Sequence, residues 1–307
     1  MTMKTPHPGT QTAPLSHRFF WLLLRGITRL NYRQQKGLSR ILTGLAPTIA
    51  RRRIQIVRTN LKLCFPDLSD EALARSVKDV TFSTILGLLE TLTAWVRPER
   101  VDGNKLTIDG LELLTDPRHP DQGILLVGMH FATLDMIGGL LGQYVDFDVM
   151  YKPSRQPFVE ALMRYGRGHY FDGVIPQNNV REVIKRLKAG RIVWYAPDQD
   201  YGAKQSVFAP FFGIPAATIT ATSRLATMTG AKIVFMSHFR QAPDGYFLNL
   251  QPPPEALPTG SDLKDAEIMN RIIESEVRKA PDEYWWVHRR FKSAPEGGRR
   301  DLYASKH

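Results

Sequence analysis

Residues 124–135 read ILLVGMHFATLD and join a continuous apolar run to a segment with a helical pattern. A short apolar run of this kind is typical of a strand buried on both faces of a parallel sheet. It predicts a strand over 124–129 that leads directly into His130, followed by a helix near 133–143. Ligands of α/β sheets bind outside the carboxyl ends of the strands. A functional site is therefore expected at this junction.

The same alternation of apolar runs and helical patterns continues along the chain. Further strands are predicted at 146–151, 173–176, 191–196, 232–237 and 246–250, and further helices at 156–168, 179–189, 215–229 and 262–279. Strands alternating with helices indicate an α/β fold with a mixed sheet flanked by helices. We expect this core to occupy residues 101–300, after a helical region over 16–100 whose last helix ends before Pro98.

The amino-terminal segment predicts a helix at a membrane surface. Residues 1–15 are polar, contain three prolines and are expected to be a disordered tail. The longest apolar run that follows, 19–24, is much shorter than the roughly 20 residues of a transmembrane helix. On a helical wheel, Arg18, Arg25, Arg29, Arg33 and Lys36 oppose Phe19, Phe20, Leu23, Ile27 and Leu30. A basic amphipathic helix suits a membrane interface, and packing on the protein's own core is the alternative.

The overall charge indicates an anionic partner. The chain has 41 Lys and Arg against 30 Asp and Glu, so its formal net charge is +11. This balance suits a membrane surface, a phosphorylated substrate, an acidic protein or nucleic acid. The basic residues are scattered and no nucleic-acid-binding motif is present, so we expect no nucleic acid partner. Cys64 is the single cysteine, which excludes an internal disulfide and a cysteine-based metal site.

The candidate catalytic pair is His130 and Asp135. If His130 ends the strand and Asp135 lies in the first turns of the next helix, the carboxylate can reach one ring nitrogen and raise the basicity of the other. This is the base and orienter of a triad without its serine. A strand-end histidine bonded to backbone is the alternative. The chain also lacks G-x-S-x-G, P-loop and H-E-x-x-H motifs, so direct transfer to an acceptor hydroxyl is favoured over a covalent intermediate.

Three further clusters contain candidate substrate-binding residues. Asp198 and Asp200 lie in a polar turn after the strand at 191–196 and suit recognition of a polar substrate, or form an Asx-type turn closed by a glycine. Arg167, at a helix end, can hold a phosphate or a carbonyl oxygen, or complement the helix dipole. Arg289 and Arg290 follow a run of aromatics that suits a phosphosugar or an acidic protein, with helix packing as the alternative.

Taken together, these segments resemble the late lipid A acyltransferases, the lauroyl and myristoyl transferases of lipopolysaccharide synthesis. The resemblance rests, in order, on NLKLCFP (60–66), VGMHF (127–131) with Asp135, WYAPDQDYG (194–202) and WWVHRRF (285–291) with APEG (294–297). It covers about residues 50–297 and is strongest toward the lauroyl-type branch.

The resemblance implies a glycerolipid-acyltransferase-like fold and an acyl carrier protein-dependent O-acyltransferase. The acceptor would be a hydroxyl of a Kdo-modified, tetra-acylated lipid A precursor. His130 and Asp135 would be catalytic, and Arg167, Asp198 and Asp200 would match the family's other motif residues. No metal and no soluble cofactor is implied. The enzyme would work at the cytoplasmic face of the inner membrane, on an anionic surface.

Two alternatives remain open. A glycerolipid or lysophospholipid acyltransferase also uses a His-x4-Asp base, but would show an F-P-E-G-T-like block where this chain reads APDQDYG (196–202). A non-catalytic, membrane-associated lipid-binding protein is the second alternative. His130→Ala would then change nothing except stability.

Overall fold

The computed structural model describes residues 14–116 and 121–303 and contains a mixed seven-stranded sheet with the order β1-β9-β8-β2-β5-β3-β4. The strands are β1 (Lys105–Asp109), β2 (Ile124–Val127), β3 (Phe147–Tyr151), β4 (Gly173–Pro176), β5 (Ile192–Tyr195), β8 (Lys232–Gln241) and β9 (Gly245–Gln251). From β4 to β8 all neighbours are parallel, whereas β9 is antiparallel to β8 and parallel to β1. The expected mixed α/β sheet flanked by helices is confirmed.

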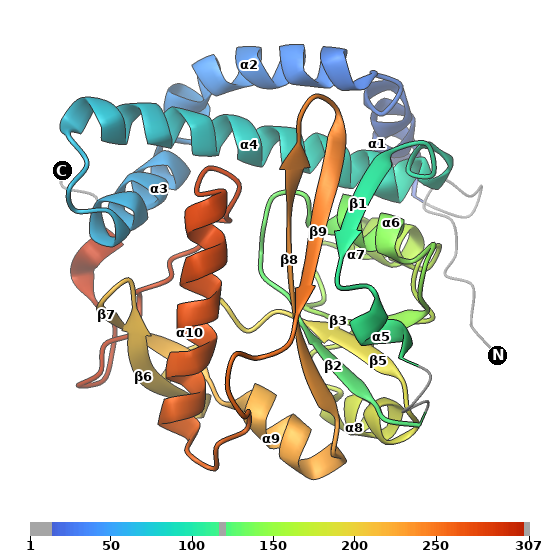
Figure 1. Cartoon of the computed structure of the whole chain (residues 1–307). Helices are drawn as coiled ribbons and strands as arrows, with labels where there is room; N and C mark the ends of the chain where they lie inside the picture. The colour runs from blue at the N-terminus through green and yellow to red at the C-terminus, as the bar shows by residue number, and fades with distance from the viewer. Residues whose placement is uncertain (1–13, 117–120, 304–307) are drawn as a thin grey trace.

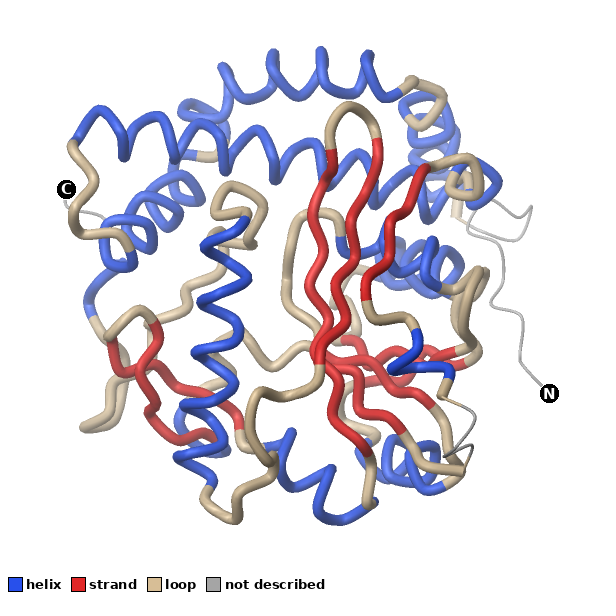
Figure 2. Tube along the Cα trace, in the orientation of Figure 1, coloured by secondary structure: helices blue, strands red, loops and turns tan. Residues whose placement is uncertain are grey.

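Helices cover both faces of this sheet (Figures 1 and 2). They are α5 (Glu112–Thr115), α6 (Leu134–Leu141), α7 (Pro157–Arg167), α8 (Val180–Lys188), α9 (Ala221–Thr229) and α10 (Asp262–Lys279). Side chains of β2 alternate between the two cores, since Leu125 and Val127 pack with α8 and α10 while Ile124 and Leu126 pack with α6. Burial on both faces explains why the strand sequence is a continuous apolar run.

Four helices form the amino-terminal part: α1 (Leu15–Ile27), α2 (Tyr32–Ile49), α3 (Arg51–Cys64) and α4 (Asp70–Val96). The expected helix at 70–97 is confirmed as α4, which Ser69 caps through its side chain and which ends before Pro98. The amphipathic segment at 16–36 is two helices rather than one. A capping box between Asn31 and Gln34 starts α2 and ends the continuity with α1.

Helix α1 keeps much of its apolar surface exposed. Trp21 is buried and packs edge-on against Tyr165 of α7, whereas Leu15, Phe19 and Leu22 are each more than 60% exposed. Within the described residues, no helix is both long enough and apolar enough to cross a membrane. The disordered tail expected over residues 1–15 falls mostly on residues 1–13, which lie outside the described residues, and is wrong at Leu15, where α1 begins. The boundaries at 16–100 and 101–300 stay predictions.

The helix predicted at 215–229 is wrong in its first part. Residues 206–219 form an antiparallel hairpin of β6 (Ser206–Phe211) and β7 (Ile214–Ile219), and α9 begins only at Ala221. Phe212 and Gly213 both have positive φ angles of 51° and 74°, which a two-residue hairpin turn requires. The hairpin packs on α10 (Figure 1). The half-exposed edge strand β1 was not predicted either.

Candidate active site

The site forms where three chain segments meet at the carboxyl ends of the parallel strands. One follows β2, a second follows β5, and the third, residues 283–293, follows α10. Strands β2 and β5 are paired in parallel with Val127 opposite Tyr195, and the Gly128 N–H donates to the carbonyl of Tyr195. Their carboxyl ends therefore deliver the two loops side by side. The third segment joins them because the Trp285 N–H donates to the carbonyl of His130 (2.8 Å).

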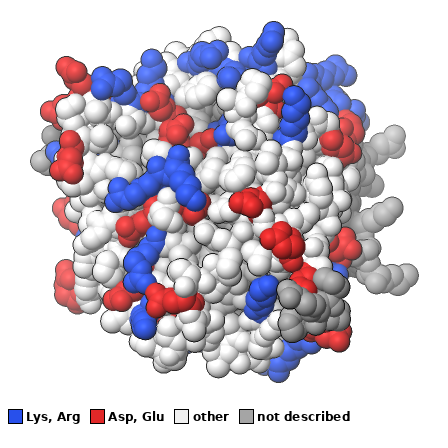
Figure 3. Space-filling view, in the orientation of Figure 1, with Lys and Arg blue, Asp and Glu red and all other residues white. Residues whose placement is uncertain are grey.

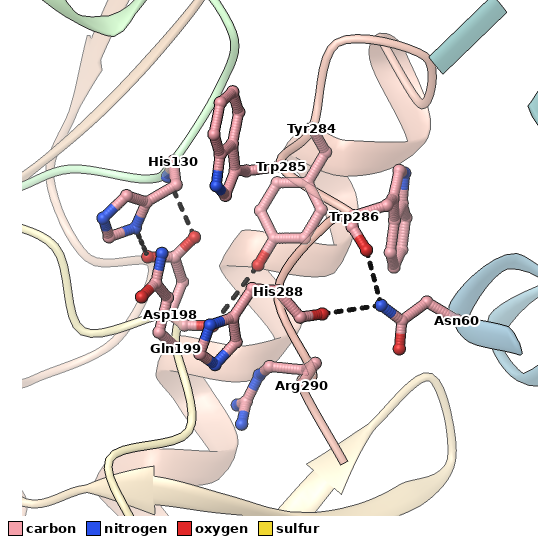
Figure 4. Close-up of a pocket in the computed structure, with 9 residues that line it drawn as sticks. All are labelled: Asn60, His130, Asp198, Gln199, Tyr284, Trp285, Trp286, His288 and Arg290. Atoms are coloured by element: carbon pink, nitrogen blue, oxygen red, sulfur yellow. Dashed lines mark hydrogen bonds and ion pairs between the residues drawn. The ribbon is translucent and has the colours of Figure 1, made fainter. Parts of the chain in front are cut away.

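His130 and Asp198 are the central pair of the site (Figure 4). Nδ1 of His130 lies 2.5 Å from Oδ1 of Asp198, and the His130 backbone N–H donates to Oδ2 at 2.9 Å. Asp198 is 1% exposed. Burial alone would raise the pKa of this carboxyl, but the charge of His130 and its hydrogen bonds bring the pKa below its usual value. The ionised carboxylate holds the proton on Nδ1 and leaves Nε2 free to accept one.

The expected contact between His130 and Asp135 is not what the structure shows. Asp135, in the first turn of α6, accepts a bidentate pair of bonds from Arg167 at 2.8 and 3.2 Å and a third from Trp95 Nε1 at 3.0 Å. Both partners of the ion pair are largely buried, with side chains 11% and 15% exposed. The carboxylate of Asp135 thus binds residues of α7 and α4, and Asp198 occupies the position beside His130 that was expected for Asp135. A catalytic role for Asp135 stays a prediction.

Arg167 is therefore held in an ion pair with Asp135. Its guanidinium also lies over the Trp95 ring, 5.6 Å from the ring centre. Arg167 and Asp135 border a second cavity between the sheet and helices α6 and α7, which is open to solvent and holds about 310 Å³ of space between its lining residues. Its other lining residues are apolar: Leu134, Gly138, Phe147, Val149, Phe171, Trp194 and Met236.

Asp200 shapes the loop that carries Asp198. Its buried carboxylate accepts from the backbone and hydroxyl of Ser293, both at 2.9 Å, and from the Gly202 N–H at 2.8 Å. The last bond is the Asx-type turn that the sequence offered as an alternative. The ammonium of Lys292 donates to the Asp200 carbonyl as well. Substrate contact by Asp200 stays a prediction.

The two arginines at 289 and 290 differ in their surroundings. Arg290 is 2% exposed, donates to the Ala217 carbonyl and Thr218 hydroxyl at 2.7 and 3.2 Å, and lies over the Phe211 ring. Arg289 is partly exposed and lies over the Tyr303 ring at 5.7 Å. Arg290 thus connects the site to the β6–β7 hairpin, whereas Arg289 is the arginine that solvent can reach. Their contact with substrate stays a prediction.

The pocket beside His130 is open to solvent and holds about 210 Å³ of space between its lining residues. It is lined by Asn60, His130, Asp198, Gln199, Tyr284, Trp285, Trp286, His288 and Arg290 (Figure 4). Site prediction from the sequence missed Asn60, Tyr284 and His288, although Asn60 and His288 lie in segments that carried the family resemblance and Tyr284 directly precedes one. Asn60, fully buried on α3, donates its amide to the carbonyls of Trp286 and His288, both at 2.7 Å. It thereby fixes the third segment to the helical region.

No group of three or more metal-binding side chains stands together in residues 14–116 and 121–303. The chemistry that the geometry offers is that of an oriented imidazole base beside a small aromatic cavity, with a larger apolar cavity nearby. Such a site can deprotonate a hydroxyl and transfer an acyl group to it.

Comparison with known proteins identifies the family. Residues 9–293 match the family of bacterial lipid A biosynthesis acyltransferases. The lipid A biosynthesis lauroyltransferase of Escherichia coli K12 is 36% identical over 293 residues, covering 95% of this chain and 94% of that protein. The palmitoleoyltransferase of the same organism is 34% identical and covers 92% and 94%. The solved PlsC acyltransferase of Thermotoga maritima aligns with TM-score 0.37 and 15% identity over 82% of this chain and 98% of its own. The family match and the two relatives show that the chain belongs to the bacterial lipid A biosynthesis acyltransferases.

Proposed function

We propose that this enzyme moves a lauroyl or myristoyl chain from acyl carrier protein to a hydroxyl of a Kdo-modified, tetra-acylated lipid A precursor. The observation that carries the proposal is the His130–Asp198 pair at the rim of the aromatic cavity. Relatives named for lauroyl, palmitoleoyl and myristoyl transfer support the reaction class and the range of chain lengths.

The reaction is a direct transfer. Nε2 of His130 forms no hydrogen bond with any described residue and takes the proton of the acceptor hydroxyl. The hydroxyl oxygen then bonds to the thioester carbon, and the carbonyl becomes an oxyanion. When the carbon–sulfur bond breaks, the thiolate leaves and receives the proton from His130. General base catalysis of this kind contributes roughly 10²–10⁴ in rate. The scheme uses no metal and no soluble cofactor.

The apolar cavity beside Asp135 receives the acyl chain of the donor. Its first lining residue, Leu134, lies four residues after His130, and its walls are aromatic and aliphatic side chains of β3, β5, β8 and α6. Asp135 and Arg167 neutralise each other at its border, so the pair holds α6 against α7 without presenting net charge to the chain.

Positive charge suits both partners. The lipid A precursor carries phosphates and Kdo carboxylates, and acyl carrier protein is acidic, whereas this chain has net charge +11. Lys and Arg side chains gather along the edge that α2 forms (Figure 3). We assign Arg289, the more exposed arginine of its pair, to the acceptor phosphates.

The enzyme works on the cytoplasmic face of the inner membrane, held there by α1 and α2. On α1, Phe19 and Leu22 are 65% and 67% exposed, and on α2, Ile41 and Ile49 are 64% and 77% exposed. Arg18 and Arg25 lie on α1, and Arg33, Lys36 and Arg40 lie on α2. Exposed apolar residues flanked by basic ones suit an anionic lipid interface.

The test is transfer by purified enzyme with acyl carrier protein loaded with C10 to C16 chains. The acceptors are the Kdo-modified precursor and, separately, lysophosphatidic acid. We expect one added acyl chain on the lipid A precursor by mass, lost in a folded His130→Ala variant. Transfer to lysophosphatidic acid alone would instead make the chain a glycerolipid acyltransferase. Equal transfer by the variant would remove His130 from the mechanism.

A further inference from the structure

A second imidazole lies in the same cavity as the base. His288 lies in the third segment and lines the cavity with His130 and Asp198 (Figure 4). Hydrogen bonds fix both the backbone and the ring of His288. The His288 carbonyl accepts from the buried amide of Asn60 at 2.7 Å, and its ring nitrogen Nε2 lies 3.1 Å from the backbone nitrogen of Asp200.

The contact with Asp200 settles which ring nitrogen carries the proton. A backbone N–H is always a donor, so Nε2 of His288 must be the acceptor and carries no hydrogen. In a neutral imidazole the single proton is then on Nδ1. This Nδ1–H forms no hydrogen bond with any residue in 14–116 or 121–303. His288 therefore has one unused donor, and it is on a ring that lines the cavity.

The surroundings keep this ring neutral. Burial, as the largest effect, together with the positive charges of Lys292, His130 and Arg290 lowers the pKa of His288 to about 4. The negative charge of Asp198 acts in the opposite direction. A neutral imidazole is a suitable donor to a carbonyl oxygen that gains charge, because it polarises that oxygen without taking up a proton beforehand.

We infer that His288 is a second catalytic residue, whose Nδ1–H donates to the thioester carbonyl oxygen as that oxygen becomes an oxyanion. The inference rests on the proposed acyl transfer. The hydroxyl oxygen bonds to the carbonyl carbon while Nε2 of His130 takes the hydroxyl proton, and the carbonyl π electrons move onto the oxygen. His288 keeps its proton throughout. The electrons return when the carbon–sulfur bond breaks and His130 passes its proton to the thiolate.

Asp200 is the positioning residue for this donor. Its carboxylate is held by Ser293 and by the Gly202 N–H, which sets the direction of its own backbone N–H. That N–H then holds Nε2 of His288. The site thereby uses a residue that the sequence had marked only as a candidate substrate ligand.

Two substitutions separate catalysis from structure. In His288→Gln, the amide oxygen can stand where Nε2 stands and accept from Asp200, but no donor replaces Nδ1–H. In His288→Asn, the amide nitrogen can stand near the Nδ1 position and donate, while the bond to Asp200 is lost. Loss of one oxyanion donor lowers kcat by roughly 10²–10³.

We therefore measure kcat and KM for acyl transfer, and the melting temperature, for the wild-type enzyme and both variants. The expected result is a His288→Gln enzyme with kcat lowered about 100-fold or more, little change in KM and an unchanged melting temperature. His288→Asn should keep more kcat than His288→Gln although it is less stable. A His288→Gln enzyme with wild-type kcat, or a His288→Asn enzyme no faster than His288→Gln, would overturn the inference. Absence of transfer by the wild-type enzyme would instead count against the proposed function.

Discussion

Asp198 holds His130 through both carboxylate oxygens, since one contacts the imidazole and the other accepts from the backbone N–H. Two residues later, Asp200 holds the imidazole of His288 through a backbone N–H. One loop thus presents an acceptor to the first ring and a donor to the second. The first ring is left with a free acceptor nitrogen and the second with a free donor.

The first prediction concerns Asp198→Asn. An amide cannot provide the negative charge that stabilises the imidazolium of His130, and it can favour the wrong tautomer. We expect kcat to fall by about 10³–10⁴, measured as initial rate of acyl transfer. Asp244→Asn is a matched control, because Asp244 is 57% exposed and pairs loosely with Lys105 at 3.9 Å. Less than a tenfold loss in Asp198→Asn would contradict the assigned role.

The second prediction concerns Asp135 and Arg167. Asp135→Asn leaves the guanidinium of Arg167 largely buried without its charge partner, which destabilises the fold by about 3–5 kcal/mol. Arg167→Met in the same chain removes the unpaired charge and should restore part of the free energy of unfolding. Urea denaturation of the two single variants and the double variant measures the coupling. Additive single and double effects would mean that the pair does not act as a unit.

The third prediction concerns the apolar cavity. An ideal Cβ on Gly138 would lie 2.9 Å from the Phe171 ring, which is too close for an ordinary contact, so Gly138→Leu displaces this ring at the wall of the cavity that both residues line. We expect the Gly138→Leu enzyme to prefer donors with shorter acyl chains than the wild type does. Because each buried CH₂ contributes about 0.8 kcal/mol, loss of two carbons of depth should change the preference about tenfold.

Competition among C10 to C16 donors, analysed by product mass, checks this shift. Met228→Leu is the control, since Met228 is 57% exposed on α9. An unchanged chain-length profile in Gly138→Leu would place the acyl chain elsewhere.

The fourth prediction concerns the pH dependence of stability. Burial, as the largest effect, with the negative charges of Asp282 and Glu90 raises the pKa of Glu283 to about 7, although the charge and the backbone N–H of Arg240 lower it. Because the folded protein binds this proton more tightly than the unfolded chain, stability falls as the pH rises from about 4.5 to 7. The shift corresponds to roughly 3 kcal/mol.

Glu283→Gln should remove that loss. The free energy of unfolding of variant and wild type, compared between pH 5 and 8, measures the difference directly. His238 and His288 have lowered pKa values of about 3 and 4 and act in the opposite sense at acid pH. Both histidines are present in the wild type and in the variant, so their effect cancels in the difference between the two. A difference that does not change with pH would show that Glu283 is ionised throughout.

The fifth prediction concerns membrane binding. Phe19→Ser with Leu22→Ser removes two exposed apolar side chains from α1 and leaves the buried Trp21 in place. We expect at least a tenfold loss of binding to vesicles that contain anionic lipid, and weaker binding of the wild type at high salt. Met228→Ser on α9, at the opposite end of the molecule in Figure 1, should bind normally. Equal binding of both variants would move the interface away from α1.

The sequence predicted the strands around the site because each is a short apolar run, and it placed His130 correctly at a strand end. It chose the wrong neighbour for the ring because Asp135 is close in sequence, whereas Asp198 is 68 residues away. Only the pairing of β2 with β5 brings Asp198 near, and no local pattern encodes which strands are neighbours. The β6–β7 hairpin was missed for a similar reason. Its turn places Phe212, a non-glycine residue, at positive φ, which the sequence does not signal.

His130 stands three residues after Val127, and Asp198 stands three residues after Tyr195, the residue paired with Val127 across the sheet. The two functional groups meet because these short offsets are equal. An insertion or deletion of one residue in either offset would separate the base from its carboxylate. The segment between the two loops contains α6, β3, α7, β4 and α8 and affects this contact only through the strand pairing. Length changes should therefore be tolerated at its surface turns and forbidden in the two three-residue offsets.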